Sequence, residues 1–455
     1  MRFIARYAKD KGRVFEIVTL YDTKTEIEQV HKQKPIIKTL SHEHPVALWF
    51  ERKMQDDFGI IVEDAFDKRP LVHQEQFPKN VHPMCKDFNE KELQYSKFQP
   101  YNYEVINGDG VFHVSVGPIH AGIIEPGHFH FSQAGEKMLH LEVRHFYTYR
   151  AIEKMLEGKT LQEAKTIIER ISGNESIAYQ ICWRDIMLQA SQQELPKSLQ
   201  KRHAFLLELE RVIHHLTDLG FIPNDAGFGA ALAIGSKLSE DARRKMKEIT
   251  GHRFGFSAVD FENKFIDTAS LHTWLDSLKE DLEYFEDWIT DIPSLWDRLD
   301  TTGILALKKA VKYDTVGVVA KASGLAIDRR INNFYLQNGF EAVTQLSGDV
   351  AARFKVRIAE VKNSLVMMHN FLEEDETILK LDSVQDGEYM SFAESSMGEL
   401  FMTIDIKDGV IERFFSRDPS FVNWQAVHLM MRNDIIADFP LINKSCDLSY
   451  AGNDL

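Results

Sequence analysis

The pattern of hydrophobic and polar positions predicts a bundle of long helices in the middle of the chain. Apolar residues recur every three or four positions across Lys201–Leu219, as in a long amphipathic helix. Two more helical stretches are predicted, over Leu271–Leu299 and over residues 350–374. Acidic residues crowd one side of the first of these, so Asp276–Glu286 is interpreted as an exposed helix face.

Alternating apolar residues predict smaller elements before the bundle. In the N-terminal block we expect a strand over Arg13–Leu20, a short helix over Glu26–Gln33 and an amphipathic helix over Pro45–Phe58. Apolar residues alternate in Val105–Val116 and Lys137–Val143, which predicts an antiparallel sheet.

A strand pair is predicted near the end of the chain. Its strands are Gly398–Ile406 and Val410–Ser416, and the Asp408-Gly409 turn between them is a strong hairpin signal. The short apolar stretches Ala226–Ile234 and Val316–Val319 are interpreted as buried core. The predicted fold class is therefore α+β: a small α/β N-terminal module, then a core of a long-helix bundle with peripheral β-strands.

Composition narrows the classes of partner. Lys+Arg 54 against Asp+Glu 69 gives a net charge of −15, which argues against nucleic acid or anionic lipid as a direct partner. The three cysteines form no C-x-x-C pair and are expected to be free thiols in a reducing cytosol. No apolar run follows the basic N-terminal residues, so we expect no signal peptide. No apolar run approaches the about 18–20 residues that span a bilayer, so we expect no membrane helix.

Two groups of motifs resemble known families. Motifs of the first 95 residues resemble the 30 kDa subunit of respiratory complex I: Ala47-Leu48-Trp49-Phe50-Glu51-Arg52, Asp57-Phe58-Gly59-Ile60, Arg69-Pro70-Leu71, His82-Pro83 and Lys86-Asp87-Phe88. Motifs from about residue 110 onward resemble the complex I 49 kDa subunit and the large subunits of membrane-bound, energy-converting nickel–iron hydrogenases: Gly117-Pro118-Ile119-His120, Glu125-Pro126-Gly127-His128-Phe129, Tyr149-Arg150-Ala151-Ile152-Glu153-Lys154, Glu208-Leu209-Glu210-Arg211, Gly251-His252-Arg253, Gly348-Asp349-Val350-Ala351-Ala352-Arg353 and Arg417-Asp418-Pro419-Ser420-Phe421. The fused order is that of the formate hydrogenlyase-type large subunit. The resemblance implies a 30 kDa subunit-like module at 1–95, a linker at 96–109 and a large subunit-like domain at 110–455.

The metal ligands of this superfamily are missing. Its hydrogenase members hold nickel and iron through two C-x-x-C pairs, whose positions here carry Ser172 and Glu175 in one segment and Ser449 and Gly452 in the other. Two hydroxyls and a carboxylate cannot replace four soft thiolates. The Pro-Arg-Gly-Glu stretch, whose arginine lies over the cofactor in the family, reads Ser396-Met397-Gly398-Glu399. Nickel enzymes also have a C-terminal extension, whereas this chain stops shortly after Gly452. We expect no metal, no cofactor bound by this chain and no hydrogenase activity.

Two residues of the Glu-Pro-Gly-His-Phe motif are candidate site residues. Glu125 matches a glutamate that passes protons in the hydrogenases, and a carboxylate in a buried turn would have a raised pKa that suits proton relay. The alternative is a turn carboxylate that accepts backbone N–H groups. His128 is the best match to the histidine that meets the quinone headgroup in complex I, and the alternative is a satisfied loop histidine. A replacement metal site at His120, His128 and His130 is disfavoured because no further ligand has convincing spacing.

The remaining candidates come from the segments that lost their cysteines. Ser172, Glu175 and Ser449 are expected to line whatever cavity remains, and Glu175 would bind protons or pair with Arg170. Tyr179 is a candidate substitute for the tyrosine of the complex I quinone pocket.

Glu208–Arg211 and Glu210–His214 lie at helical contact spacing. We interpret them as a solvated or interface ion-pair network.

The resemblance implies a subunit of a complex I-like, energy-converting oxidoreductase complex. Electron transfer, with a quinone as one candidate acceptor, would be coupled there to ion translocation. A small iron–sulfur subunit with a 4Fe-4S cluster and membrane ion-translocating subunits are the implied partners. The chain would be cytoplasmic, attached through them to the inner face of the cytoplasmic membrane. The alternative is a purely structural scaffold subunit with no redox site of its own.

Overall fold

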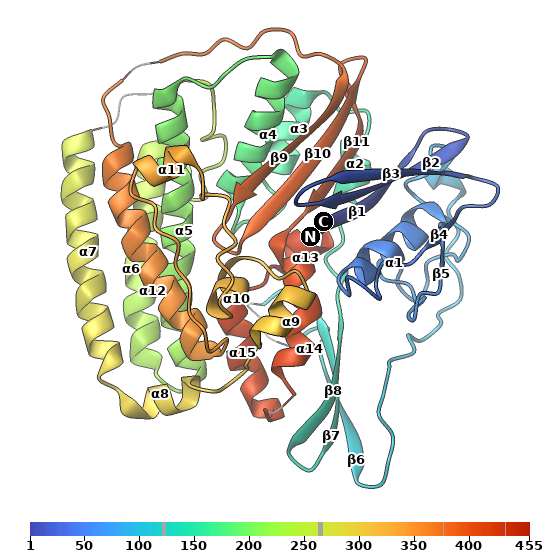
Figure 1. Ribbon diagram of the computed structural model, residues 1–455, viewed down its shortest axis with the longest axis horizontal. Coiled ribbons are helices and arrows are strands. Elements are labelled where there is room, and N and C mark those ends of the chain that lie inside the picture. Colours follow the sequence, from blue (N-terminus) through green and yellow to red (C-terminus); the bar gives the residue numbers. More distant parts are fainter. Residues whose placement is uncertain (121–123, 263–266, 376, 433) are drawn as a thin grey trace.

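The computed structural model describes residues 1–120, 124–262, 267–375, 377–432 and 434–455. Long helices lie side by side at one side of the molecule, and the N-terminal module lies at the other side (Figure 1). A three-stranded sheet near the C-terminus of the chain lies between them. No helix of the described residues is long and apolar enough to cross a membrane.

Four helices form the bundle. They are α5 (Lys197–Asp225), α6 (Gly229–Thr250), α7 (Thr268–Thr290) and α12 (Val350–Phe371). Three of them, α5, α7 and α12, lie where the apolar periodicity predicts helical stretches. Helices α5 and α6 approach closely at two glycines, since a Cβ atom on Gly235 would lie 2.6 Å from the Cα of Gly220.

The predicted single helix over Leu271–Leu299 is wrong, because the chain breaks there into α7 and α8 (Pro293–Leu299). Pro293 occupies the first turn of α8, where its missing N–H is tolerated, and the same proline cannot continue α7. The acidic side of α7 is exposed as predicted, with its leucines buried on the opposite face.

The N-terminal module combines two small sheets and a helix. Strands β1 (Phe3–Asp10), β2 (Val14–Tyr21) and β3 (Thr25–His31) pair antiparallel in that order. Helix α1 (Ala47–Phe58) packs on β1 and connects the parallel pair β4 (Ile36–Lys38) and β5 (Ile61–Glu63). The predicted helix over Glu26–Gln33 is wrong: the chain turns back after β2 and pairs with it. This long-range pairing outweighs the local preference of the glutamates for a helix.

Two further three-stranded antiparallel sheets contain the predicted strands, although the strand expected over Val105–Val116 begins only at Val111. The first is β6-β7-β8, formed by Val111–Val116, His128–Ala134 and Lys137–Arg144. The second is β11-β10-β9, formed by Val410–Arg417, Glu399–Lys407 and Gly387–Glu394, with the predicted Asp-Gly turn between β10 and β11.

Shorter helices connect these layers and complete the core. They are α2 (Ile152–Leu156), α3 (Leu161–Ile168), α4 (Ser176–Ser191), α9 (Leu307–Lys312), α10 (Gly317–Ala322), α11 (Asn333–Gln337), α13 (Pro419–Asn423), α14 (Val427–Met430), α15 (Phe439–Cys446) and α16 (Tyr450–Asp454). Val316–Val319 is buried as predicted. Ala226–Ile234 is not: only Ala231 in this stretch is buried, because it forms the exposed end of α6 and the turn before it.

One apolar core runs from the N-terminal module into the C-terminal sheet. Tyr7 of β1 stacks on Phe415 of β11 with ring centroids 4.5 Å apart, and Phe50 of α1 packs edge-on against Phe421 at 4.6 Å. A second, smaller core lies within the N-terminal module alone. The buried Glu399 side chain on β10 also pairs with Arg2 at 2.6 Å, so charges as well as rings join the two regions.

Candidate functional site

The two segments that lack the family cysteines meet in the folded chain. Ser172, just before α4, and Ser449, which caps α16, lie with their hydroxyl oxygens 3.3 Å apart. The Ser449 hydroxyl also accepts the backbone N–H of Gly452 at 2.8 Å, and its carbonyl accepts the indole N–H of Trp424 at 3.1 Å. We call the residues around this contact (Ser172, Glu175, Tyr179, Asp418, Ser449 and Gly452) the vacated site.

Packing around Gly452 leaves no room for a cysteine. A Cβ atom built on Gly452 would lie 1.9 Å from Oδ2 of Asp418, well inside van der Waals contact. The cavity beside Gly452 and Asp418 has a volume of about 10 Å³, at the lower limit for one water molecule. These residues do not fit a nickel–iron centre, since they lack soft donors as well as space.

Glu175 is the buried carboxyl group of the vacated site. It is fully buried, and its Oε1 accepts the Ser395 hydroxyl at 2.6 Å. Burial, followed by the neighbouring Asp418 carboxylate, raises the pKa of Glu175 well above its usual value. Glu175 does not pair with Arg170, which instead pairs with Glu169 and stacks on Phe256. The raised pKa favours the protonated form of Glu175.

Tyr179 joins the same group from the next turn of α4. It is fully buried, and its hydroxyl donates to Oδ2 of Asp418 at 3.4 Å. Burial and the Asp418 charge raise the pKa of Tyr179 well above its usual value. The other oxygen of Asp418 accepts the backbone N–H of Ser420 at 2.8 Å. Tyr179 is thus a neutral hydrogen-bond donor inside the protein.

His128 belongs to a different part of the molecule, the sheet β6-β7-β8. Its Nδ1–H donates to the carbonyl of Gly117 at 3.2 Å, and its ring stacks on Tyr103 at 4.7 Å. Burial lowers the pKa of His128, so the ring is neutral and its buried, unpartnered Nε2 is an acceptor. The contacts of His128 do not overlap with those of Tyr179. Tyr103, in the linker, covers His128 and carries no motif that would have identified it.

Glu125 is placed differently from the expectation of a buried turn. Its side chain is exposed, and Oε2 accepts the backbone N–H of Ala451 at 2.9 Å. Glu125 thus ties the Glu-Pro-Gly-His-Phe loop to the α16 segment. The expected burial is wrong because the Pro126-Gly127 turn directs the backbone, rather than the carboxylate, inward: Gly127 is buried.

A separate cavity of about 260 Å³ lies next to the loop that carries Glu125 and His128. His120, Phe129 and Tyr450 are among its lining residues. Burial lowers the pKa of His120, and its Nε2 has no hydrogen-bond partner among the residues that the structure describes. Neither His128 nor Tyr179 lines this cavity.

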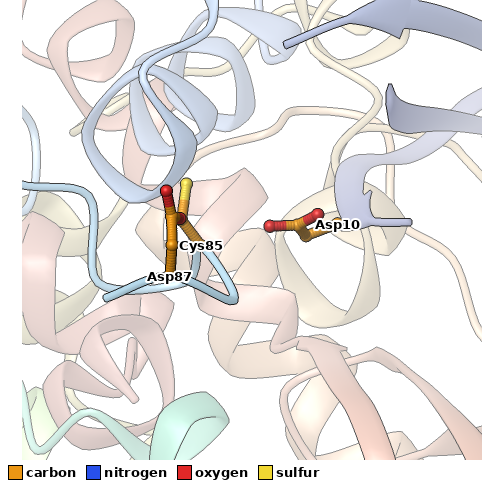
Figure 2. Close-up of side chains that lie close together, drawn as sticks. All are labelled: Asp10, Cys85 and Asp87. Carbon is orange, nitrogen blue, oxygen red and sulfur yellow. The ribbon is translucent and has the colours of Figure 1, made fainter. Parts of the chain in front are cut away.

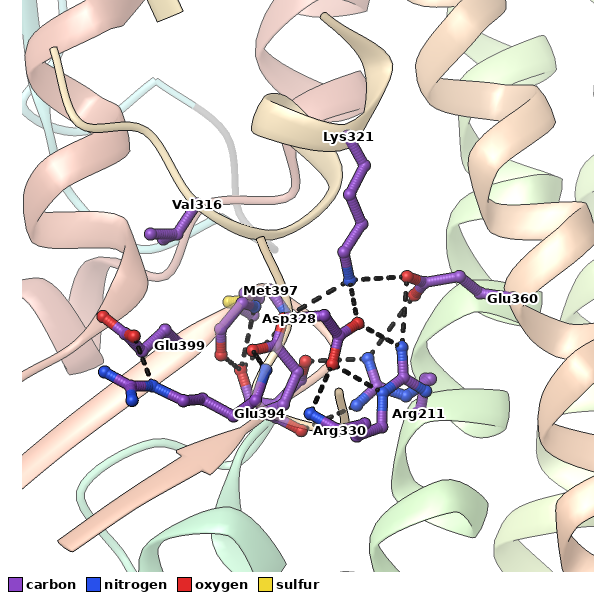
Figure 3. Close-up of polar contacts among 12 residues, drawn as sticks. Arg211, Val316, Lys321, Asp328, Arg330, Glu360, Glu394, Met397 and Glu399 are labelled. Carbon is purple, nitrogen blue, oxygen red and sulfur yellow. Dashed lines mark hydrogen bonds and ion pairs between the residues drawn. The ribbon is translucent and has the colours of Figure 1, made fainter. Parts of the chain in front are cut away.

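Glu208 and Arg211 are fully buried, so their interpretation as solvated or interface charges is wrong. They belong to a buried ion network that joins α5, α10, α12, β9 and the loop after α10 (Figure 3). Its ionic groups are Glu208, Arg211, Lys321, Asp328, Arg330, Glu360 and Glu394. The i,i+3 spacing of Glu208 and Arg211 was visible in the sequence. Their partners lie more than a hundred residues away along the chain, so no local pattern reveals them.

Glu210 also differs from its predicted pairing with His214. Its carboxylate accepts the backbone N–H groups of Ile177 at 2.7 Å and of Ala178 at 3.3 Å. These N–H groups belong to the first turn of α4, where the helix itself supplies no backbone acceptor for them. A carboxyl group of α5 thus caps the helix that carries Tyr179.

One group of side chains among the described residues has metal-like spacing: Asp10, Cys85 and Asp87 (Figure 2). Asp10 already accepts the Lys32 ammonium and the backbone N–H of Lys86 at 2.8 Å. Burial raises the pKa of the Cys85 thiol to about 12, which disfavours the thiolate that a metal needs. The chemistry of this group favours a structural ion pair.

Comparisons with known proteins agree with the motifs. Residues 225–382 and 375–454 match the family of the respiratory-chain NADH dehydrogenase 49 Kd subunit, and residues 5–94 match that of the 30 Kd subunit. Formate hydrogenlyase subunit 5 of Escherichia coli (strain K12) is 26% identical, over 94% of this chain and 78% of that protein. The NADH-quinone oxidoreductase C/D protein of Phocaeicola vulgatus is 23% identical, over 92% of this chain and 86% of that protein. Membrane-bound hydrogenase subunit alpha of Pyrococcus furiosus is 24% identical, over 73% of this chain and 85% of that protein.

The fold is shared with a solved respiratory complex. A chain of the membrane-bound sulfane sulfur reductase, an archaeal respiratory membrane complex, superposes with a TM-score of 0.70 and 19% identity. The match covers 76% of this chain and 99% of that chain. The predicted α+β fold and the fused order of the two modules are confirmed. The chain belongs to the family of the respiratory-chain NADH dehydrogenase 49 Kd subunit, fused behind a region of the 30 Kd subunit family.

Proposed function

We propose that this chain is a metal-free large subunit of a membrane-associated, complex I-like oxidoreductase complex. Its task is to couple electron transfer in the complex to ion translocation. Relatives named as parts of formate hydrogenlyase, of a membrane-bound hydrogenase and of NADH-quinone oxidoreductase support this assignment. The coupling uses proton binding and conformational change at the vacated site instead of hydrogen chemistry.

One observation carries the proposal: Glu175, a fully buried carboxyl group with a raised pKa, stands at a position that the resemblance identifies with a metal ligand of the hydrogenases. It lies between Ser395, at 2.6 Å, and Asp418, whose carboxylate contributes to its raised pKa. A shared proton between two carboxyl groups can be bound or released when a nearby charge changes. The vacated site thus keeps a proton-exchanging group, although it has lost the ligands and the space for a metal.

The redox groups belong to other components of the complex. We propose a small iron–sulfur subunit with a 4Fe-4S cluster, and membrane subunits that translocate ions, as partners on the inner face of the membrane. A quinone remains a candidate acceptor. It would not be clamped between His128 and Tyr179, because Tyr179 is fully buried against Asp418 and His128 is covered by Tyr103.

Replacement of Glu175 by Gln in the purified, membrane-reconstituted complex tests the proposal. We expect E175Q to assemble and to lower the number of ions translocated per electron. Exposed Glu248→Gln on α6 is the matched control and should leave this ratio unchanged. An unchanged ratio in E175Q would contradict the proposal.

The second candidate is the structural scaffold, a subunit without a role in proton or electron transfer. The near absence of free volume beside Gly452 favours it. A scaffold predicts that E175Q changes only the stability of the complex, whereas a role in coupling predicts normal assembly with lost translocation.

A further inference from the structure

A continuous set of hydrogen bonds leads from the vacated site into the buried ion network. Ser395 lies at the junction: its hydroxyl donates to Glu175 at 2.6 Å, and its carbonyl accepts from Arg211 at 2.8 Å. The same guanidinium donates to the carbonyl of Glu394 at 2.6 Å and pairs with Glu208 at 3.1 Å. A change of charge in the network is therefore felt at Glu175 through one serine and one arginine.

Among the seven groups that these ion pairs join, the carboxylates outnumber the cations by one, and the nearby Arg329 guanidinium pairs instead with Glu399. Three cationic side chains, Arg211, Lys321 and Arg330, face four carboxylates: Glu208, Asp328, Glu360 and Glu394. Because these groups are buried, an unbalanced negative charge is costly there. Addition of one proton makes the set neutral.

Glu394 has the weakest pairing of the four carboxylates. Lys321 approaches it only to 3.3 Å, but comes within 2.7 Å of both Asp328 and Glu360 (Figure 3). The other oxygen of Glu394 accepts a backbone N–H, that of Arg329, at 3.0 Å.

The pKa shifts also set Glu394 apart from Asp328 and Glu360. Burial and then the Asp328 charge raise the pKa of Glu394 to about 7. Although burial opposes it, Lys321 and Arg330 hold the pKa values of Asp328 and Glu360 below their usual values. Burial lowers the pKa of His215, which bonds Glu360, to about 4, so this ring stays neutral.

A cavity lies beside Glu394. Its volume is about 160 Å³, enough for several water molecules, and Glu394 is part of its wall. Charged groups of several elements surround Glu394: Arg184 and Asp185 on α4, Arg211 on α5, Lys321 on α10, Asp328, Arg329 and Arg330 in the following loop, Glu360 on α12, and Glu399 directly opposite on β10.

We propose that Glu394 is a proton-loading site that exchanges a proton between water in this cavity and the ion network. A hydronium ion gives its proton to the Glu394 carboxylate, which leaves water and a neutral carboxylic acid. Loss of the negative charge weakens the ion pair between Glu394 and Lys321. The resulting change in electrostatic potential reaches the vacated site through Arg211 and Ser395. The inference deepens the proposed coupling function and rests on it for its role, although the protonation itself can be measured without it.

Infrared difference spectroscopy of the intact complex, with this chain labelled in its glutamate carboxyl carbons, tests the proposal. Spectra taken between about pH 5.5 and 8.5 should contain a carboxylic-acid C=O band that disappears with a midpoint near pH 7. Replacement of Glu394 by Gln should abolish this band. The control E388Q, on the same strand but with an exposed carboxylate, should retain it.

Two results would overturn the proposal: a wild-type spectrum without a glutamate that titrates near pH 7, or an unchanged band in E394Q. The wild-type measurement decides the matter even if E394Q does not fold. A complex without coupled ion translocation would refute the proposed function and leave the band in place, so the two failures are distinguishable.

Discussion

At the scale of single residues, each former ligand position has acquired a new structural partner. Ser172 contacts Ser449, Glu175 accepts from Ser395, and Gly452 lies against Asp418. The motifs led us to expect Ser172 and Ser449 around one shared cavity, and their hydroxyl oxygens lie 3.3 Å apart. The motifs could not predict Asp418 or Ser395 as partners, because a hydrogen bond across more than two hundred residues leaves no local pattern.

Gly452→Ala should destabilise the chain, because the added Cβ must displace the Asp418 carboxylate from 1.9 Å. Overpacking of this kind costs about 1–3 kcal/mol of unfolding free energy. Gly173→Ala in the partner segment is the matched control, since a Cβ there meets nothing within 4 Å. Urea unfolding of both variants measures the difference, and equal stability would show that the vacated site is looser than described.

Glu394 should make stability depend on pH. Its folded-state pKa of about 7 lies above the unfolded value of about 4.5, so the folded state keeps a proton that the unfolded state releases. The contribution of this group is fully present below pH 4.5 and is lost as the pH rises to 7, by about 3 kcal/mol. Unfolding free energies at about pH 5 and pH 8 should therefore fall more in the wild type than in E394Q. Parallel curves would contradict the assignment.

At the scale of elements, periodicity predicted α5, α12 and the β10–β11 hairpin, but not α6 or the break between α7 and α8. Helices α5 and α12 and the pair β10–β11 depend on local apolar spacing and turn chemistry, which a sequence shows directly. The strand β3 was missed because its pairing with β2 overrides local preference. The cap of α4 was missed for a related reason: its carboxylate, Glu210, comes from another helix.

Removal of the Glu210 cap should destabilise α4. Glu210→Ala leaves the backbone N–H groups of Ile177 and Ala178 buried without acceptors, at a cost of about 2 kcal/mol or more. Glu210→Gln keeps an acceptor oxygen in the same place and should retain most of the stability. Chemical denaturation compares the two variants, and equal losses in both would show that charge, rather than the cap, matters.

At the scale of the whole molecule, one apolar core joins the N-terminal module to the C-terminal sheet. The motifs predicted two modules with a linker at 96–109, and this division remains a prediction. They did not predict the interface, where Tyr7 stacks on Phe415 and Arg2 pairs with Glu399. Such contacts depend on how finished elements pack, which hydrophobic patterns along one element do not specify.

The continuous core predicts that the two modules unfold together. Tyr7→Ala removes a buried ring from the shared core and should lower stability by about 3 kcal/mol in a single calorimetric transition. Ile27→Ala, at a site 60% exposed on β3, should change little. Two separate transitions in the wild type would show that the modules are energetically independent.

This large subunit keeps the family fold, and we propose that a buried carboxyl group with a raised pKa, Glu175, has replaced its metal site. Elemental analysis of the purified, catalytically active complex tests it most directly, with nickel counted per copy of this chain. Since none of the three free cysteines stands at the four positions of the vacated site that correspond to metal ligands, and Asp418 fills the space at Gly452, we predict far less than one nickel per chain and no hydrogen uptake. One nickel per chain that persists after chelation would contradict the account.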